Sequence, residues 1–139
     1  MSAFPGKLEF LYVGTADFDR DFAYYRDVLE APLVWAFEKY ETRVAAFRLC
    51  DGPLYLLADH RPAGSCLLLI AVDDLEATAA ALRARGWRSE SDGFEIPPGP
   101  CYLFSDPSGN PLAIFQNVRP GLMEERYADP DNPHAFGKP

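Results

Sequence analysis

Recognisable catalytic signatures are missing from this sequence. It has only two histidines, His60 and His134, and its three cysteines form no CxxC pair. It also lacks a glycine-rich phosphate loop and a nucleophile elbow. Neither histidine has a carboxylate at an informative spacing, so His60 in the linker is predicted to be a solvated residue. These absences favour a binding protein over an enzyme.

Basic residues are outnumbered by acidic ones, 13 to 21, and the formal net charge is −8. Because nucleic acids are bound by clustered Lys and Arg, no nucleic-acid partner is expected. No apolar run approaches the ~18 residues of a membrane span, and the first residues do not resemble a signal peptide. Cys50, Cys66 and Cys101 are an odd number and lie in apolar strands, which predicts buried free thiols in a cytoplasmic protein.

An internal repeat is the strongest positive feature of the sequence. Residues 8–57 and 65–114 follow one pattern at a constant offset without a gap. The aligned pairs include Phe10 with Leu67, Asp17 with Asp74, Phe47 with Phe104, and Gly52 with Gly109. A register kept over that length indicates two copies of one structural module.

Each copy is predicted to be a βαβββ module. A first strand leads to an amphipathic helix capped by Asp17 in one copy and by Asp74 in the other. The predicted strands are 8–13, 33–40, 43–49 and 53–58 in module one (7–59), and 66–72, 88–96, 101–104 and 111–117 in module two (65–117). Together they would form a single domain, 1–118.

Residues 119–139 form a C-terminal tail rich in Pro, Asp and Glu. We predict that the tail docks on the body or on a partner subunit through apolar residues. They are Leu122, Met123, Tyr127 and Phe136. Disorder is the alternative, given Pro130, Pro133 and the acidic residues.

Two tandem βαβββ modules ending in the turn 106–111 (Asp-Pro-Ser-Gly-Asn-Pro) resemble the vicinal oxygen chelate superfamily. That superfamily includes glyoxalase I, extradiol dioxygenases and bleomycin-resistance proteins. Segments 23–29 and 72–75 resemble the starts of its first and second helices, and the resemblance covers about 7–117. It implies an α+β fold in which a curled mixed sheet forms a cup with helices packed outside, and it implies a homodimer.

The resemblance also places the family's metal ligands on the first and last strand of each module. Those positions are Phe10, Leu56, Leu67 and Ala113 in this sequence. All four side chains are hydrocarbon and cannot donate a lone pair to a divalent ion. A register shifted by one residue would place Glu9 and Cys66 at the ligand positions of the first strands, but their side chains lie on the strand face that meets the helices. We therefore expect no metal and no cofactor.

Strand alternation predicts an apolar lining for the inside of the cup. The predicted ligand-binding residues are Phe10, Tyr12, Trp35, Phe37, Phe47, Leu56, Leu67, Leu69, Tyr102, Phe104, Ala113 and Phe115. Aromatic walls suit planar, apolar ligands, which the hydroxyls of Tyr12 and Tyr102 would orient. Glu38, Glu41 and Asp92 are placed near the rim, where they would meet a cation.

The resemblance to the bleomycin-resistance branch implies metal-free sequestration of an aromatic or cationic small molecule. Two alternatives stay open. One is an enzyme: a glyoxalase-like lyase or dioxygenase with displaced metal ligands, or a metal-free isomerase that uses Tyr or Glu. The other is a pseudo-enzyme without catalysis that dimerises, in which the same aromatic residues fill a plain hydrophobic core.

Overall fold

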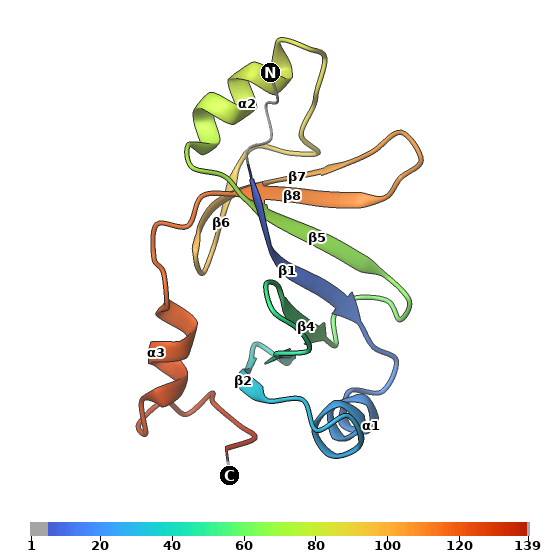
Figure 1. Ribbon diagram of the computed structural model, residues 1–139, viewed down its shortest axis with the longest axis vertical. Helices are drawn as coiled ribbons and strands as arrows, with labels where there is room; N and C mark the ends of the chain where they lie inside the picture. The colour runs from blue at the N-terminus through green and yellow to red at the C-terminus, as the bar shows by residue number, and fades with distance from the viewer. Residues whose placement is uncertain (1–5, 139) are drawn as a thin grey trace. The chain divides into compact units, whose positions relative to one another are not determined.

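The computed structural model describes residues 6–138 and divides them into two compact units (Figure 1). The first unit contains residues 10–66 and 123–138, and the second contains residues 6–9 and 67–122. In both halves of the chain a strand is followed by a helix and then by three strands. The predicted α+β fold of two βαβββ modules is therefore confirmed. Within the described residues, no helix is long and apolar enough to span a membrane.

The first unit is built on four strands in the order β2-β3-β4-β1. The elements are β1 (Lys7–Gly14), of which residues 10–14 belong to this unit, α1 (Phe18–Ala23), η1 (Tyr24–Val28), β2 (Leu33–Lys39), β3 (Thr42–Phe47) and β4 (Leu54–Ala58). β1 runs parallel to β4, and β3 is antiparallel to both β2 and β4. The parallel pair is possible because the long connection through α1, β2 and β3 returns the chain in the same direction.

Helix α1 begins at the predicted cap, where the backbone N–H of Arg20 donates to Oδ1 of Asp17 at 3.1 Å. Its apolar side chains, Phe18 and Phe22, are buried against one face of the sheet. The helix then widens into the π-helical segment η1, whose exposed face carries Tyr24 and Val28. One face of the sheet in the first unit is thus covered by the helix.

The second unit has the strand order β5-β8-β7-β6. Its elements are β5 (Cys66–Ala71), α2 (Leu75–Arg83), β6 (Phe94–Ile96), β7 (Gly99–Ser105) and β8 (Pro111–Phe115). Asp74 caps α2 by accepting from the N–H of Ala77 at 3.0 Å. The predicted strand 88–96 is mostly wrong, because regular pairing is confined to Phe94–Ile96. Ser91, Asp92 and Gly93, which favour bends over strands, precede it.

The turn between β7 and β8 is the one that the sequence predicts. Oδ1 of Asp106 accepts from the backbone N–H groups of Ser108 and Asn110, both at 2.9 Å. The hydrogen bond from the Asn110 side-chain amide, and after it these backbone bonds, lower the pKa of the Asp106 carboxyl, because they stabilise its charged form. Gly109 takes a positive φ of 89°, which glycine adopts without a steric penalty.

The three cysteines are free, and only one is buried. Burial raises the pKa of the Cys101 thiol to about 11. The prediction of buried thiols is wrong for Cys50 and Cys66, which are exposed. Cys66 is the first residue of its strand, and Cys50 lies in the connection before β4, so neither is enclosed by neighbouring strands.

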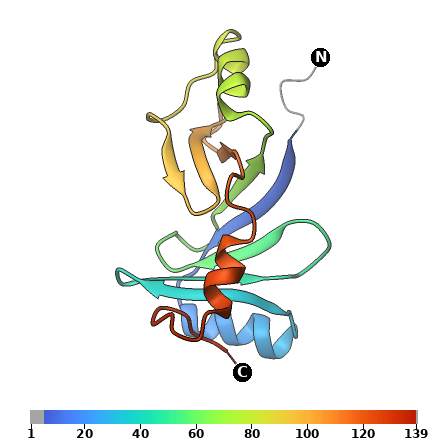
Figure 2. The ribbon, with the colours of Figure 1, turned by 90° about the vertical axis from the view of Figure 1, so that its left-hand side faces the viewer.

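The tail crosses an edge of the first unit (Figure 2). Helix α3 (Leu122–Ala128) packs Met123 and Tyr127 on the sheet face opposite α1. Residues 134–136 then pair with β2, because the N–H of Glu38 donates to His134 O at 2.9 Å and the N–H of Phe136 to Ala36 O at 3.1 Å.

The end of the tail reaches the other face of the same sheet. The Phe136 ring lies 6.0 Å from that of Phe18 and 5.7 Å from that of Phe22. Docking on the body is thereby confirmed for Met123, Tyr127 and Phe136, while Leu122 is half-buried at the start of α3. The alternative of a disordered tail is wrong for these segments.

Replacing Phe136 by alanine should therefore destabilise the first unit. We expect a loss of about 2 kcal/mol in the free energy of unfolding, less than for a fully buried phenylalanine because the ring is half-buried. Urea denaturation would measure it, with the exposed Glu125→Ala on the same tail as control. An unchanged denaturation midpoint for Phe136→Ala would show that the tail does not contribute to the fold.

Candidate functional site

Four side chains form a row across the first unit, on the sheet face opposite α1. Cross-strand pairing aligns Tyr12 of β1 with Leu56 of β4, Leu56 with Ala46 of β3, and Ala46 with Trp35 of β2. Directly paired residues point to the same side of a sheet. Phe10 and Phe37 flank this row on the same face. We call Phe10, Tyr12, Trp35, Phe37 and Leu56 the aromatic face.

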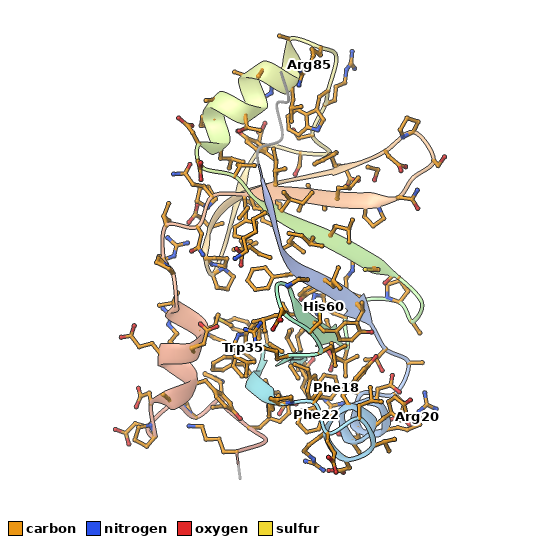
Figure 3. The ribbon with its side chains drawn as sticks, viewed as in Figure 1. Phe18, Arg20, Phe22, Trp35, His60 and Arg85 are labelled. Carbon is orange, nitrogen blue, oxygen red and sulfur yellow. The ribbon has the colours of Figure 1, made fainter. Side chains whose placement is uncertain are left out.

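The aromatic face is only partly covered. Trp35 and Leu56 are buried, with 4% and 6% of their surface exposed, whereas Phe10, Tyr12 and Phe37 are half-buried. The Trp35 and Phe37 rings lie 5.8 Å apart in the cluster that also contains Met123 of α3. Trp35 lies on the side of the sheet that carries α3 (Figure 3). Tyr127 of α3 meets Phe37 edge to face at 5.7 Å. The tail thus closes the β2 end of the face, while Phe10 and Tyr12 lie at its β1 end.

A polar cluster borders the aromatic face at Tyr12. The Tyr12 hydroxyl lies 3.0 Å from Nε2 of His60, and the two rings meet edge to face at 5.6 Å. Burial raises the pKa of the Tyr12 phenol to about 12; the charge of Arg61 acts against this rise and that of Asp59 adds to it. The phenol is therefore neutral near pH 7. His60 is exposed, as predicted, but its bond to Tyr12 was not predicted.

Gly14 holds the His60–Arg61 segment in place. Residues 61–62 pass so close to the end of β1 that a Cβ atom on Gly14 would lie 2.0 Å from the carbonyl oxygen of Pro62. The N–H of Gly14 donates to Ser65 O at 3.3 Å, and the N–H of Ser65 donates back to Pro62 O at 3.1 Å. The linker is thus fixed against β1, and nothing in its sequence apart from Pro62 and Gly64 indicates a rigid loop.

The positions that the family resemblance gives to metal ligands do not fit a metal ion. In the first unit they are Phe10 and Leu56, and in the second unit Leu67 and Ala113, all hydrocarbon. Leu56, Leu67 and Ala113 are buried. Across residues 6–138, no three His, Cys, Asp or Glu side chains are grouped so as to hold a metal ion. No chemical step is therefore assigned to a metal in this chain.

The prediction that Phe47 lines the inner face is wrong. Phe47 pairs with Tyr55 across β3 and β4, one residue out of phase with Leu56. Its ring packs 5.5 Å from the rings of both Phe22 and Tyr25, on the face covered by α1 and η1. The error arose because the side on which β3 places each residue depends on its pairing with β4 and cannot be read from alternation within β3 alone.

Tyr102 and Phe104 are also on the helix-covered face, in the second unit. They pair with Ile114 and Leu112, whereas Ala113 and Phe115 point the other way. The Trp87 ring packs against both, 5.9 Å from that of Tyr102 and 5.4 Å from that of Phe104. The Tyr102 hydroxyl donates to Oε1 of Glu76 at 2.8 Å and faces α2. It cannot orient a ligand on the opposite face.

The remaining second-unit residues lie on the predicted face. Leu69 pairs with Ala113 and Ala71 with Phe115, opposite the α2-covered cluster. Leu67, two residues before Leu69, shares this side. Their role in ligand binding stays a prediction. Of the predicted rim acids, Glu38 lies 3.8 Å from Nε of Arg43, and Glu41 and Asp92 are exposed.

The fold and the family resemblance define one class of protein, and the comparisons with known proteins support it. The chain belongs to the glyoxalase/bleomycin resistance protein/dioxygenase superfamily, whose family model matches residues 7–114. The resemblance inferred from the repeat and its final turn is thereby confirmed at the level of the superfamily. A search of curated proteins gives no significant match.

Solved structures share the fold at low sequence identity. Methylmalonyl-CoA epimerase from Mycobacterium tuberculosis gives a TM-score of 0.70 at 17% identity, covering 85% of this chain and 93% of that chain. A methylmalonyl-CoA epimerase in complex with methylmalonyl-CoA and NH4+ gives 0.65 at 15%, covering 82% and 96%. A hypothetical protein from Bacillus halodurans C-125 gives 0.66 at 14%, covering 81% and 94%. These similarities show the fold alone and do not single out the bleomycin-resistance branch.

Proposed function

We propose that this chain binds a planar, apolar small molecule on the aromatic face and holds it without a metal ion, in the manner of bleomycin-resistance proteins. The observation that carries the proposal is the row Tyr12–Leu56–Ala46–Trp35. The superfamily's metal-ligand positions in this unit are occupied by the hydrocarbon side chains of Phe10 and Leu56, and half-buried aromatic rings lie beside them. The side chains of this face can stack and bury apolar area, but they cannot polarise a substrate oxygen through a metal.

Apolar burial supplies the affinity in this proposal. Each Å² of apolar ligand surface removed from water contributes roughly 25 cal/mol. An aromatic pair adds about 0.5–1.5 kcal/mol beyond that area term. Tyr12 supplies ring surface at one end of the row, and Trp35 supplies it at the other end, with Phe37 beside it. Trp35 is also a natural fluorescent reporter.

A neutral planar compound, 2-naphthamide, tests the proposal. We expect it to quench the fluorescence of Trp35 in a Trp87→Phe background, with unchanged affinity after dialysis against EDTA. Phe37→Ala should weaken binding about fivefold, the equivalent of one lost aromatic contact. The control is Tyr24→Ala, which removes an exposed aromatic ring on η1, outside the aromatic face.

Two results would contradict the proposed function. One is a stoichiometric content of Zn, Ni, Mn or Fe in the purified protein together with loss of binding on its removal. The other is a flat titration, with neither a fluorescence change nor a rise in thermal stability at saturating 2-naphthamide. The second outcome would favour a filled hydrophobic core.

A further inference from the structure

We propose that Arg61, His60 and Tyr12 form a carboxylate-binding subsite at the β1 end of the aromatic face. The inference rests on the proposed function and specifies its ligand as a planar aromatic acid. The aromatic face would bind the ring system, and the polar cluster would bind the acid group. The acidic residues predicted at the rim would attract a cation, whereas this cluster would bind an anion.

Arg61 has an unused hydrogen-bond donor. Its Nε atom is buried and has no hydrogen-bond partner among residues 6–138. An unsatisfied buried donor costs about 1–3 kcal/mol, more when it carries charge, so native proteins rarely keep one without a use. A guanidinium presents Nε–H and Nη–H in a planar fork that matches the two oxygens of a carboxylate.

The nearest acidic residue in the sequence does not occupy that fork. Oδ1 of Asp59 accepts from the backbone N–H of Arg43 at 2.9 Å, and Oδ2 accepts from Nε of Arg43 at 3.3 Å. Both oxygens of Asp59 are therefore engaged by Arg43. The Nε–H of Arg61 is left to bind an anion that comes from outside the chain.

Tyr12 and His60 add polar hydrogen-bonding atoms, and the charge of Arg61 acts on the Tyr12 phenol, which places the guanidinium in its vicinity. The Tyr12 phenol stays protonated near pH 7, so its hydroxyl can donate to an anion. His60 lies within hydrogen-bond distance of that hydroxyl, at 3.0 Å from Nε2, and is exposed on its other side. Tyr12 also belongs to the aromatic face, which places the acid-binding atoms next to the ring-binding surface.

The backbone that carries Arg61 is held in place before a ligand arrives. The bond from Ser65 N–H to Pro62 O and a second from the Ser65 hydroxyl at 2.6 Å fold the linker back on itself. The close approach at Gly14 keeps this fold against β1. Since this backbone is already positioned, only side chains have to move to admit a carboxylate, and binding would cost less conformational entropy than it would on a flexible loop.

Matched probes test this inference by calorimetry. The probes are 2-naphthoate and 2-naphthamide, which share the ring system and differ in charge. We expect wild-type protein to bind the naphthoate at least about tenfold more tightly, the equivalent of one charge-assisted hydrogen bond or more. Arg61→Gln should abolish this preference, by weakening the binding of naphthoate about tenfold or more and that of naphthamide much less. Tyr12→Phe should reduce the preference severalfold, which tests the subsite even if Arg61→Gln fails to fold.

The control is Arg85→Gln, which makes the same change of charge at an exposed residue of the second unit, beyond α2. It should keep the full preference for naphthoate. Equal affinities of the two probes for wild-type protein, or a preference that survives Arg61→Gln, would overturn the carboxylate subsite while leaving the proposed function intact. No binding of either probe would overturn both.

Discussion

Phe47→Ala is expected to lower the free energy of unfolding by about 3–5 kcal/mol, the usual cost of truncating a fully buried phenylalanine. Phe47 is completely buried, with 0% of its surface exposed, and its ring packs against Phe22 and Tyr25 under the helix. Removing the ring would leave a cavity that the aromatic cluster cannot close without strain. Urea denaturation followed by far-UV circular dichroism would measure the loss.

A second substitution of Phe47 tests whether this residue belongs to the core or contacts the ligand. The milder Phe47→Leu should keep the protein folded and change the affinity for 2-naphthamide by less than about twofold, because Phe47 faces away from the aromatic face. Tyr40→Ala, at a tyrosine that is 87% exposed, is the stability control and should change little. Loss of naphthamide binding in a stable Phe47→Leu protein would return Phe47 to the ligand-binding set.

Gly14→Ala is expected to destabilise the protein by about 3 kcal/mol, at the upper end of overpacking effects. The added Cβ would lie 2.0 Å from the carbonyl oxygen of Pro62 and 2.5 Å from that of Arg61. Both are backbone atoms and cannot rotate away, so the linker must move. We expect the displaced linker to lose the Tyr12–His60 hydrogen bond and, with it, the preference for naphthoate over naphthamide.

Gly52→Ala is the matched control for this substitution. Gly52 has a positive φ of 99° and open space around its Cβ position, so its replacement by alanine costs only the strain of the left-handed backbone, about 1–2 kcal/mol. Thermal unfolding would compare the two variants, and the ring protons of His60 in NMR spectra would report the linker. A Gly14→Ala protein as stable as Gly52→Ala, with unchanged His60 signals, would show that the linker adapts freely.

Local and periodic features of the fold could be predicted from the sequence. Asp17 and Asp74 cap their helices as expected, and the turn at Asp106 forms. These features depend on neighbouring residues, whose preferences are visible in the sequence. The repeat predicted the order of elements in both modules, because a fixed register transfers the assignment of one module to the other. For the same reason, the error at Phe47 was carried over to Phe104.

The candidate site was predictable only in part. Phe10, Tyr12, Trp35, Phe37 and Leu56 lie on one face, as alternation within their strands indicated. The contact between Tyr12 and His60 joins residues far apart in the sequence and depends on how Pro62 approaches Gly14. The course of the linker and the unpaired Nε–H of Arg61 have no local sequence signal, because both follow from three-dimensional packing.

The pairing of residues 134–136 with β2 has a consequence for how copies of this chain can meet. β2 ends the strand order of the first unit, and a bare sheet edge is a template for strands from other molecules. The tail uses the N–H of Glu38 and the carbonyl of Ala36, two of the groups that an incoming strand would need. The tail thus blocks the β2 edge against pairing with strands of other molecules. Association through strand addition at β2 would first require residues 134–136 to dissociate from it.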